Sequence, residues 1–196
     1  VYKRQMAKTI ITIGREYCTG GNYIAEDVAN ALGIKLYDKE LITMAAKHSG
    51  LSEEAVAASE KRRTHSLLYS LYTMGNELPL GDQVFILQSR IIKQLADEGP
   101  CVIVGRCADY ILQDTADCLK VFIHADLAFR AHRIVEVYGQ REQSPEERLR
   151  DKDKRRAAYH RFYTNMKWGH AQNYHLTLDS GVIGIDKCVD IIAELY

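Results

Sequence analysis

The 196-residue sequence has little of what marks several protein classes. It has three prolines and no low-complexity tract, so long disordered segments are not expected. No apolar run approaches the ~18 residues that a membrane-spanning helix requires. Lysine plus arginine and aspartate plus glutamate balance at 26 each, so no overall positive field would attract a nucleic acid. We therefore expect neither a membrane nor a nucleic acid as a partner.

Cysteine and histidine spacing argues against disulfides and metal sites. The five cysteines include no C-x-x-C pair, and the seven histidines include no H-x-x-x-H pair. A reducing compartment, the cytoplasm, is therefore the expected location. Residues 1–5, before Met6, contain no apolar signal-peptide core and are interpreted as an upstream remnant. Residues 6–196 are predicted to form one domain.

What the sequence does contain is an alternation of short apolar runs with helical periodicity. Strands are predicted at 8–13, 34–37, 101–105, 118–125 and 174–179, with helices between them. Because the runs are almost continuously apolar, they predict an α/β fold with a parallel sheet covered by helices on both faces. Between the second and third strands lies a helical insert, much longer than a usual crossover.

Several residues follow directly after predicted strands. In a parallel α/β sheet, ligands bind at the carboxyl ends of the strands. The residues expected to converge on that rim are Gly14, Asp38, Gly105, Arg106, Ala125 and Asp126. Asp38 is also in position to cap the next predicted helix.

The segment GREYCTGGN, Gly14–Asn22, joins the first predicted strand to the first predicted helix. A helix N-terminus offers unpaired amides to an anion, and Gly20 and Gly21 permit close approach. The phosphate-loop pattern G-x-x-x-x-G-K-[ST] would put its first glycine at Arg15, its lysine at Gly21 and its hydroxyl at Asn22. All three are absent. From these residues alone, a phosphate site and a plain glycine turn weigh equally.

Arginines supply the second signal for an anion. Arg106 directly follows a buried strand, which indicates that it points into the rim; the alternative is pairing with a structural carboxylate. Arg130 and Arg133 share a helical face, as a phosphate clamp or as an exposed basic stripe. The charged stretch RLRDKDKRR (148–156) lies in a predicted helix that begins with Ser144 and Pro145. Such a helix is a solvated face or a lid over a polyphosphate.

Several segments together resemble the nucleoside monophosphate kinases, and specifically the bacterial cytidylate kinases. The block VIVGRCADYILQDTADCLKVFIHADLAFRAHRI (102–134) resembles that family's strand–GRD–helix–strand–RA-x-R-R block. DKRR (153–156) matches the lid pattern D-x-x-R, and LGIKLYD (32–38) matches the segment before the monophosphate-binding part. A divergent branch whose loop resembles REYGSGGR fits better still. The likeness leaves out the helical insert.

The resemblance implies a P-loop kinase fold with a helical acceptor-binding subdomain at 38–98 and a lid at 139–165. It implies transfer of the γ-phosphoryl group of ATP, with Mg²⁺, to a nucleoside monophosphate such as CMP or dCMP. The loop would bind the donor through Arg15, Glu16, Tyr17, Cys18, Thr19, Gly20, Gly21 and Asn22. The acceptor would be bound by Asp38, Arg106, Arg130, Arg133, Asp153, Arg156 and Tyr159. The catalytic groups would be Arg15, Arg106, Arg130, Asp153 and Arg156.

The sequence departs from that family at informative positions. Gly21 replaces the lysine, Cys107 replaces the aspartate of GRD, and Leu149 stands where another lid arginine falls, beside Arg150. Phosphoryl transfer depends on positioning and charge neutralisation, so another cation can replace the lysine. The first candidate is Arg15 and the second is Lys39. Asn22 would offer Mg²⁺ a carbonyl oxygen in place of a hydroxyl.

Three alternatives stay open at this stage. The chain could be a nucleotide-binding protein that has lost its chemistry, or a kinase whose acceptor is not a nucleotide. It could also be an interaction module, a homodimer through the apolar face SLLYSLYTM (66–74) of the insert. Charging Leu68 and Leu71 would test that contact.

Overall fold

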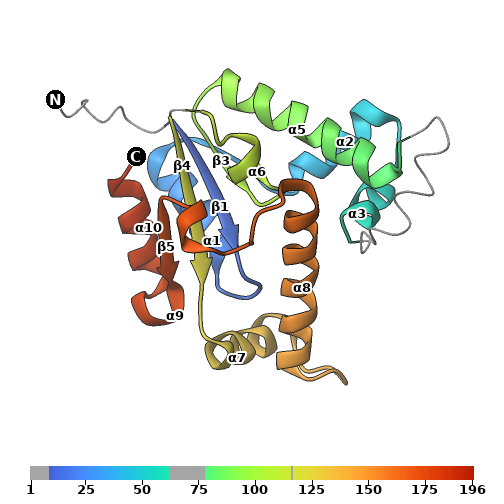
Figure 1. The fold of residues 1–196 in the computed structure, drawn as a ribbon. Coiled ribbons are helices and arrows are strands. Elements are labelled where there is room, and N and C mark those ends of the chain that lie inside the picture. Colours follow the sequence, from blue (N-terminus) through green and yellow to red (C-terminus); the bar gives the residue numbers. More distant parts are fainter. Residues whose placement is uncertain (1–8, 62–77, 116) are drawn as a thin grey trace.

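The computed structural model describes residues 9–61, 78–115 and 117–196. In this part of the chain, five parallel strands form one sheet in the order β2-β3-β1-β4-β5 (Figure 1). The strands are β1 (Ile10–Arg15), β2 (Lys35–Tyr37), β3 (Cys101–Val104), β4 (Cys118–His124) and β5 (Leu176–Asp179). The predicted α/β class with a parallel sheet is confirmed. Because β1 runs two residues further than predicted, Arg15 is the last residue of a strand.

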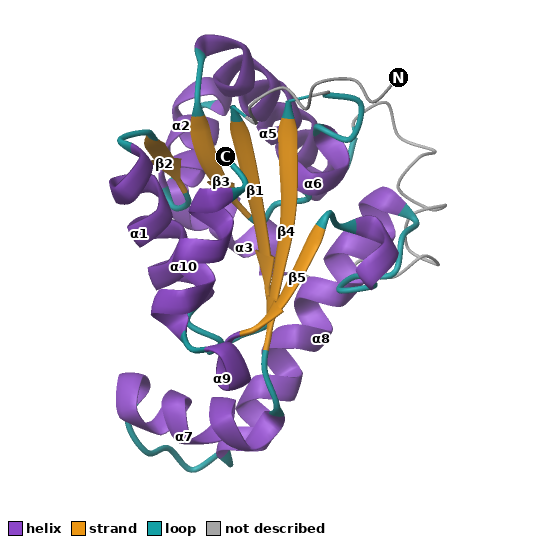
Figure 2. Ribbon diagram, turned by 90° about the vertical axis from the view of Figure 1, so that its left-hand side faces the viewer, coloured by secondary structure: helices purple, strands orange, loops and turns teal. Residues whose placement is uncertain are grey.

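Helices cover both faces of the sheet (Figure 2). Their bounds are α1 (Gly21–Leu32), α2 (Glu40–Ser49), α3 (Glu53–Lys61), α5 (Leu80–Glu98), α6 (Ala108–Ile111), α7 (Leu127–Tyr138), α8 (Pro145–Thr164), α9 (Ser180–Ile183) and α10 (Ile185–Glu194). A short 3₁₀ turn, Ala171–Asn173, precedes β5. Among the described residues, no helix combines the length and the apolarity of a membrane span.

The strands are apolar on both sides because each side meets a layer of helices. Ile11 and Ile13 of β1 are fully buried in a cluster with α1 and α10, whereas Ile10 belongs to a second cluster with α2 and α5. Fully burying such a side chain contributes about 1.5–3 kcal/mol. Two helical layers therefore hold β1 at the centre of the sheet, and its end carries the candidate site.

The described parts of the insert between β2 and β3, within 38–61 and 78–98, are mainly helical, as their periodicity predicts. Val84, Ile91 and Leu95 of α5 are buried against α2 and the sheet. The hydroxyl of Ser52 accepts a hydrogen bond from the amide of Ala55 at 3.2 Å, which caps α3. The predicted dimer face at 66–74 lies outside the described residues.

Helices α7 and α8 lie past the carboxyl end of β4, and α8 runs from there back toward α5 (Figure 1). Ser144 caps α8 by accepting a hydrogen bond from the amide of Glu147 at 3.2 Å, as predicted. Leu149 is completely buried against Ile134 of α7. At the C-terminal end of α8, Tyr163 stacks on Phe85 of α5 with ring centroids 4.0 Å apart. Helix α8 thus spans the rim of the sheet and is anchored at both ends.

Candidate active site

The segment between β1 and α1 is a wound loop that leads into the helix. Gly20 has a φ of 82°, a left-handed conformation that glycine adopts without strain. A Cβ on Gly20 would also lie 2.6 Å from the Cδ1 of Ile185. The hydroxyl of Thr19 donates to the carbonyl oxygen of Glu16 at 3.1 Å, and that of Ser180 donates to the carbonyl oxygen of Thr19 at 2.7 Å. These contacts hold the loop in its wound conformation.

Arg15 extends its side chain across Gly21. A Cβ on Gly21 would lie 2.7 Å from the Cβ of Arg15 and 2.9 Å from its Cγ. The Nε of Arg15 donates to the Oδ1 of Asn22 at 3.0 Å, and its Nη2 lies 3.7 Å from the Oδ1 of Asp38. The side chain of Arg15 therefore fills the space in which a side chain at position 21 would begin. Lys39, the second candidate cation, is exposed at the start of α2.

Asp38 joins the ends of three strands. Its carboxylate accepts hydrogen bonds from the Nδ2 of Asn22 at 2.9 Å and from the Nη1 of Arg106 at 3.2 Å. The prediction that Asp38 caps α2 is wrong, because Lys39 occupies the N-cap position and its side chain makes no capping hydrogen bond. Asp38 instead faces Arg15 and Arg106, two cations that would repel each other without it.

A strained turn after β3 orients Arg106. Arg106 and Cys107 have φ values of 50° and 57°, which side chains other than glycine adopt at a cost of order 1–3 kcal/mol each. The Nη1 of Arg106 also lies 3.4 Å from the carbonyl oxygen of Val104. Arg106 thus pairs with a carboxylate and also lines the cavity at the rim, and its contact with a substrate stays a prediction.

Helix α8 contacts the loop through two side chains that the sequence singles out. The Oδ1 of Asp153 accepts a hydrogen bond from the amide of Tyr17 at 2.8 Å. The Nη1 of Arg156 donates to the carbonyl oxygen of Arg15 at 3.0 Å, and its guanidinium lies 5.3 Å from the ring centroid of Tyr17. Burial lowers the pKa of Arg156 and nearby Asp153 opposes that shift, but an arginine stays charged. Helix α8 therefore packs directly on the loop.

Arg130 of α7 is buried and forms an ion cluster with two partly exposed carboxylates. Its Nη1 is 2.5 Å from the Oδ2 of Asp153, its Nε donates to the carbonyl oxygen of Ala125 at 3.0 Å, and its Nη2 lies 3.5 Å from the Oε2 of Glu16. Burial raises the pKa of Glu16, and the charge of Arg130 opposes that shift. Arg130 and Asp153 line neither cavity described below, so their predicted contacts with a substrate stay predictions.

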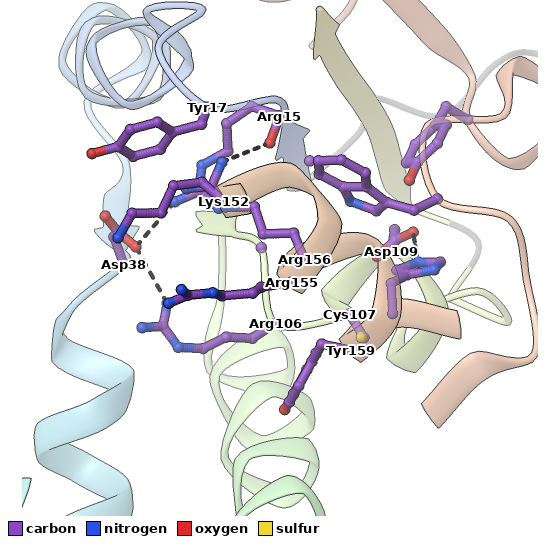
Figure 3. A pocket seen from close by; sticks show the side chains of 15 residues that line it. Arg15, Tyr17, Asp38, Arg106, Cys107, Asp109, Lys152, Arg155, Arg156 and Tyr159 are labelled. Carbon is purple, nitrogen blue, oxygen red and sulfur yellow. Dashed lines mark hydrogen bonds and ion pairs between the residues drawn. The ribbon is translucent and has the colours of Figure 1, made fainter. Parts of the chain in front are cut away.

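A first cavity of about 290 Å³ opens between the ends of β1, β2 and β3 and the side of α8 (Figure 3). At one end, positive side chains surround Asp38. These are Arg15, Arg106, Lys152, Arg155 and Arg156. At the far end, the Oδ2 of buried Asp109 lies 3.0 Å from the Nε2 of buried His160. Aromatic rings of Tyr159, Trp168 and Tyr174 line the remaining wall. The cavity is suited to a molecule with an anionic end and a flat polar body.

A second cavity, of about 330 Å³, lies over the loop. It is lined by Cys18, Gly20, Gly21 and Asn22 from the loop and by Arg133 from α7. Three residues, Arg15, Tyr17 and Arg156, line both cavities and so form the wall between them. The two cavities therefore share two arginines and one tyrosine in their linings.

The predicted rim forms in part. Gly14, Asp38, Gly105 and Arg106 meet at the first cavity, as expected. Ala125 and Asp126 do not, because they line a separate cavity of about 430 Å³, and the Oδ1 of Asp126 accepts a hydrogen bond from the amide of Phe129 at 2.7 Å. The end of β4 is thus used to start α7.

Six residues of the first cavity were not named as site residues from the sequence: Lys152, Arg155, Asp109, His160, Trp168 and Tyr174. The spacing of positions 152, 155, 156 and 159 on one face of a helix could have grouped Lys152 and Arg155 with Arg156. No local pattern singles out Asp109 and His160, which are 51 residues apart and meet only in the folded chain.

The described residues offer Mg²⁺ few protein ligands. None of them form a group of three or more histidine, cysteine, aspartate or glutamate side chains able to hold a metal. The Oδ1 of Asn22 already accepts a hydrogen bond from Arg15, and its Nδ2 donates to Asp38. Asn22 as a magnesium ligand stays a prediction, and a magnesium ion here would be held mainly by the phosphates of a bound nucleotide.

Thiol chemistry should report on the loop. All five cysteines are described, and only Cys18 is not buried. We expect one thiol of the native protein to react with Ellman's reagent, faster as the pH rises, because burial raises the pKa of Cys18 and the thiolate is the nucleophile. Tripolyphosphate should slow the reaction by occupying the second cavity. Two or more fast thiols, or no protection by tripolyphosphate, would contradict this picture.

Comparison with known proteins gives the fold and the family. The chain is similar to an uncharacterised protein from Eubacterium ventriosum, with 28% identity, a TM-score of 0.74 and 95% and 97% of the two chains covered. It shares its fold with a shikimate kinase from Acinetobacter baumannii (TM-score 0.53, 14% identity, 97% and 93% covered). It also shares it with a gluconokinase from Sinorhizobium meliloti (TM-score 0.54, 13% identity, 98% and 96% covered). Among curated proteins, none matches significantly.

The family assignment comes from the sequence itself. Residues 10–182 match the cytidylate kinase-like family, a span that includes the loop, the helical insert and α8. Family and fold support a phosphotransferase that uses a nucleotide. The chain belongs to the cytidylate kinase-like family.

Proposed function

We propose that this protein transfers the γ-phosphoryl group of ATP to a nucleoside monophosphate such as CMP or dCMP. The observation that carries the proposal is the shared wall of the two cavities, formed by Arg15, Tyr17 and Arg156. The triphosphate lies on the loop in the second cavity, and the acceptor lies in the first. An acceptor phosphate oxygen attacks the γ-phosphorus, and ADP leaves.

The charges of the site support this reaction. Phosphoryl transfer requires that negative charge on the donor and the acceptor be neutralised in place. Arg15 supplies the cation that the phosphate-loop pattern assigns to position 21, since its side chain fills the space over Gly21. Arg106 holds the acceptor phosphate in the first cavity. Mg²⁺ arrives with ATP and neutralises its phosphates.

Arg130 and Asp153 position the site in this proposal. Asp153 bonds to the amide of Tyr17 and to Arg130, and Arg130 bonds to the carbonyl oxygen of Ala125. The cluster thereby ties α8 and the end of β4 to the loop. The segment 38–98 serves as the acceptor-binding side, and 139–165 serves as the lid.

The direct test is an assay of the purified chain with ATP, Mg²⁺ and a panel of acceptors. We expect diphosphate formation with CMP or dCMP above that with AMP, GMP or UMP. ATP binding without turnover on any acceptor would instead indicate a non-catalytic nucleotide-binding protein. Phosphorylation of shikimate or gluconate, the acceptors named for the two structural neighbours, would indicate a kinase of a non-nucleotide.

Arg106→Ala should weaken binding of the acceptor in the first cavity and leave binding of ATP in the second cavity unchanged. Hydrogen bonds to charged groups contribute about 1.5–3 kcal/mol, so the KM for the acceptor should rise about 10- to 100-fold. The Kd for ATP should stay unchanged, because Arg106 lines only the first cavity. Arg90→Ala removes an exposed arginine from α5 and serves as the control. A loss of ATP affinity equal to the rise in KM would contradict the assignment of Arg106 to the acceptor.

A further inference from the structure

The second cavity has exposed apolar side chains in its lining, in addition to the residues of the loop. Of the seven large apolar side chains that are exposed in the described residues, three line this one cavity. They are Tyr23 (52% exposed), Val137 (43%) and Tyr138 (48%). Apolar side chains scattered singly over a surface need no explanation, whereas apolar side chains gathered around a cavity indicate a ligand.

The rings in this lining are ordered by contacts on the protein. Tyr138 stacks on Tyr17 with centroids 5.8 Å apart and an interplanar angle of 17°. The guanidinium of Arg133 lies 5.3 Å from the ring centroid of Tyr23. Because α1 and α7 already hold these groups, a flat ligand that packs on them orders few additional side chains.

We propose that the rim, formed by Tyr23, Arg133, Val137 and Tyr138, binds the nucleobase of the phosphoryl donor. This inference rests on the proposed function and adds to it the residues that contact the base. The loop in the same cavity receives the triphosphate, so the occupant has an anionic end and a flat, apolar end. A nucleoside triphosphate has both.

The other occupants match only half of the cavity. Tripolyphosphate would leave the exposed rings in water. An apolar segment of a second copy of the chain would cover the rings and leave the loop amides and Arg133 without an anion. Stacking on aromatic rings and arginine tolerates any base, so the rim secures the donor without selecting strongly among bases.

The test compares ATP with tripolyphosphate, by calorimetric titration of the whole chain. Tyr138→Ala and Tyr23→Ala should each weaken the binding of ATP about tenfold, the usual size of one lost base stack. The binding of tripolyphosphate should change by no more than about twofold, since the loop is untouched. Tyr138→Phe keeps the ring and should keep the affinity for ATP.

Leu195→Ala is the matched control, because Leu195 is 48% exposed, as Tyr138 is, and lines neither cavity. Unchanged ATP affinity in both tyrosine variants would overturn the inference and leave the proposed function standing. Equal losses for ATP and tripolyphosphate would also overturn it, because the loop would then be what was damaged. If sedimentation showed that Tyr138→Ala dissociates a dimer and ATP affinity did not change, the rim would be a contact between copies. If the wild type bound neither ligand, the proposed function would fall together with the inference.

Discussion

The double variant Arg15→Gly/Gly21→Lys is expected to retain phosphoryl transfer, whereas each single variant is expected to lose most of it. Arg15→Gly removes the cation at the wall between the cavities. Losing one preorganised group at a site of developing charge lowers turnover by about 100- to 1,000-fold. Gly21→Lys alone puts a Cβ 2.7 Å from the Cβ of Arg15, so the loop must shift out of its phosphate-binding shape.

We expect the double variant to be active because Arg15→Gly removes the side chain that obstructs position 21, and Gly21→Lys supplies a new positive charge. It restores the first glycine and the lysine of the phosphate-loop pattern at the positions where that pattern requires them. We expect its turnover to lie within about tenfold of the wild type, because the lysine replaces the positive charge that Arg15→Gly removes.

Steady-state rates with ATP and the best acceptor, together with the Kd for ATP, measure this effect. Arg15→Lys keeps a positive charge and should lose less than Arg15→Gly does. Full activity in Arg15→Gly would show that a different cation, such as Lys39 or Arg133, neutralises the donor. A double variant as inactive as the single variants would show that Arg15 does not replace the lysine missing from position 21.

Arg130→Met is expected to lower the free energy of unfolding by about 3 kcal/mol, because Arg130 is buried and its loss leaves two partly buried carboxylates without the cation that they share. Asp153 and Glu16 would both lose their cation. Asp153→Asn should destabilise as well. The double variant Arg130→Met/Asp153→Asn should lose less free energy of unfolding than the sum of the two single losses, by a coupling of order 1–3 kcal/mol.

The pH dependence gives a second readout of Arg130→Met. Burial already raises the pKa of Glu16 and Arg130 opposes that shift, so the variant raises the folded-state pKa further. A group with a raised pKa favours the folded state below its unfolded pKa, and this contribution is lost as the pH rises through the folded pKa. The destabilisation should therefore be larger at pH 8 than near pH 4.5.

Urea titrations at both pH values measure these changes. Lys187→Met is the control, because Lys187 and Asp190 form an exposed ion pair at 3.5 Å whose loss should cost under about 1 kcal/mol. If Arg130→Met instead kept its stability and raised the KM for the acceptor, Arg130 would contact substrate, as the family resemblance implies.

Much of the fold was predictable because it depends on local patterns. Buried strands, helix caps such as Ser52 and Ser144, and the periodicity of α5 all appear in windows of fewer than twenty residues. The short helix α9 was not predicted, because four residues are too few to show a period. The end of β1 was placed two residues early, because Gly14 reads as a turn although Gly14 and Arg15 continue the ladder with β4.

The site was predictable only as far as strand ends determine it. Asp38 and Arg106 were expected to meet, since parallel strands bring their carboxyl ends to one rim, and they lie 3.2 Å apart. Arg130 and Arg133 share a helical face, yet their side chains have different surroundings. Arg130 belongs to the ion cluster, and Arg133 lines the second cavity. Helical spacing states which side chains are neighbours, but not which surface they meet.

The sequence by itself determined the alternation of strands and helices, the glycine loop before α1 and the absence of the lysine from position 21. These follow from residue type and spacing, which act over a few residues. Only the tertiary structure decided that Arg15 lies over Gly21, that Asp109 meets His160 and that Arg156 joins two cavities. Asp109 and His160 are 51 residues apart and meet only after distant segments have packed. Arg15 and Gly21 are close in sequence, but the path of the Arg15 side chain over Gly21 depends on how the loop is wound, and no local pattern encodes it.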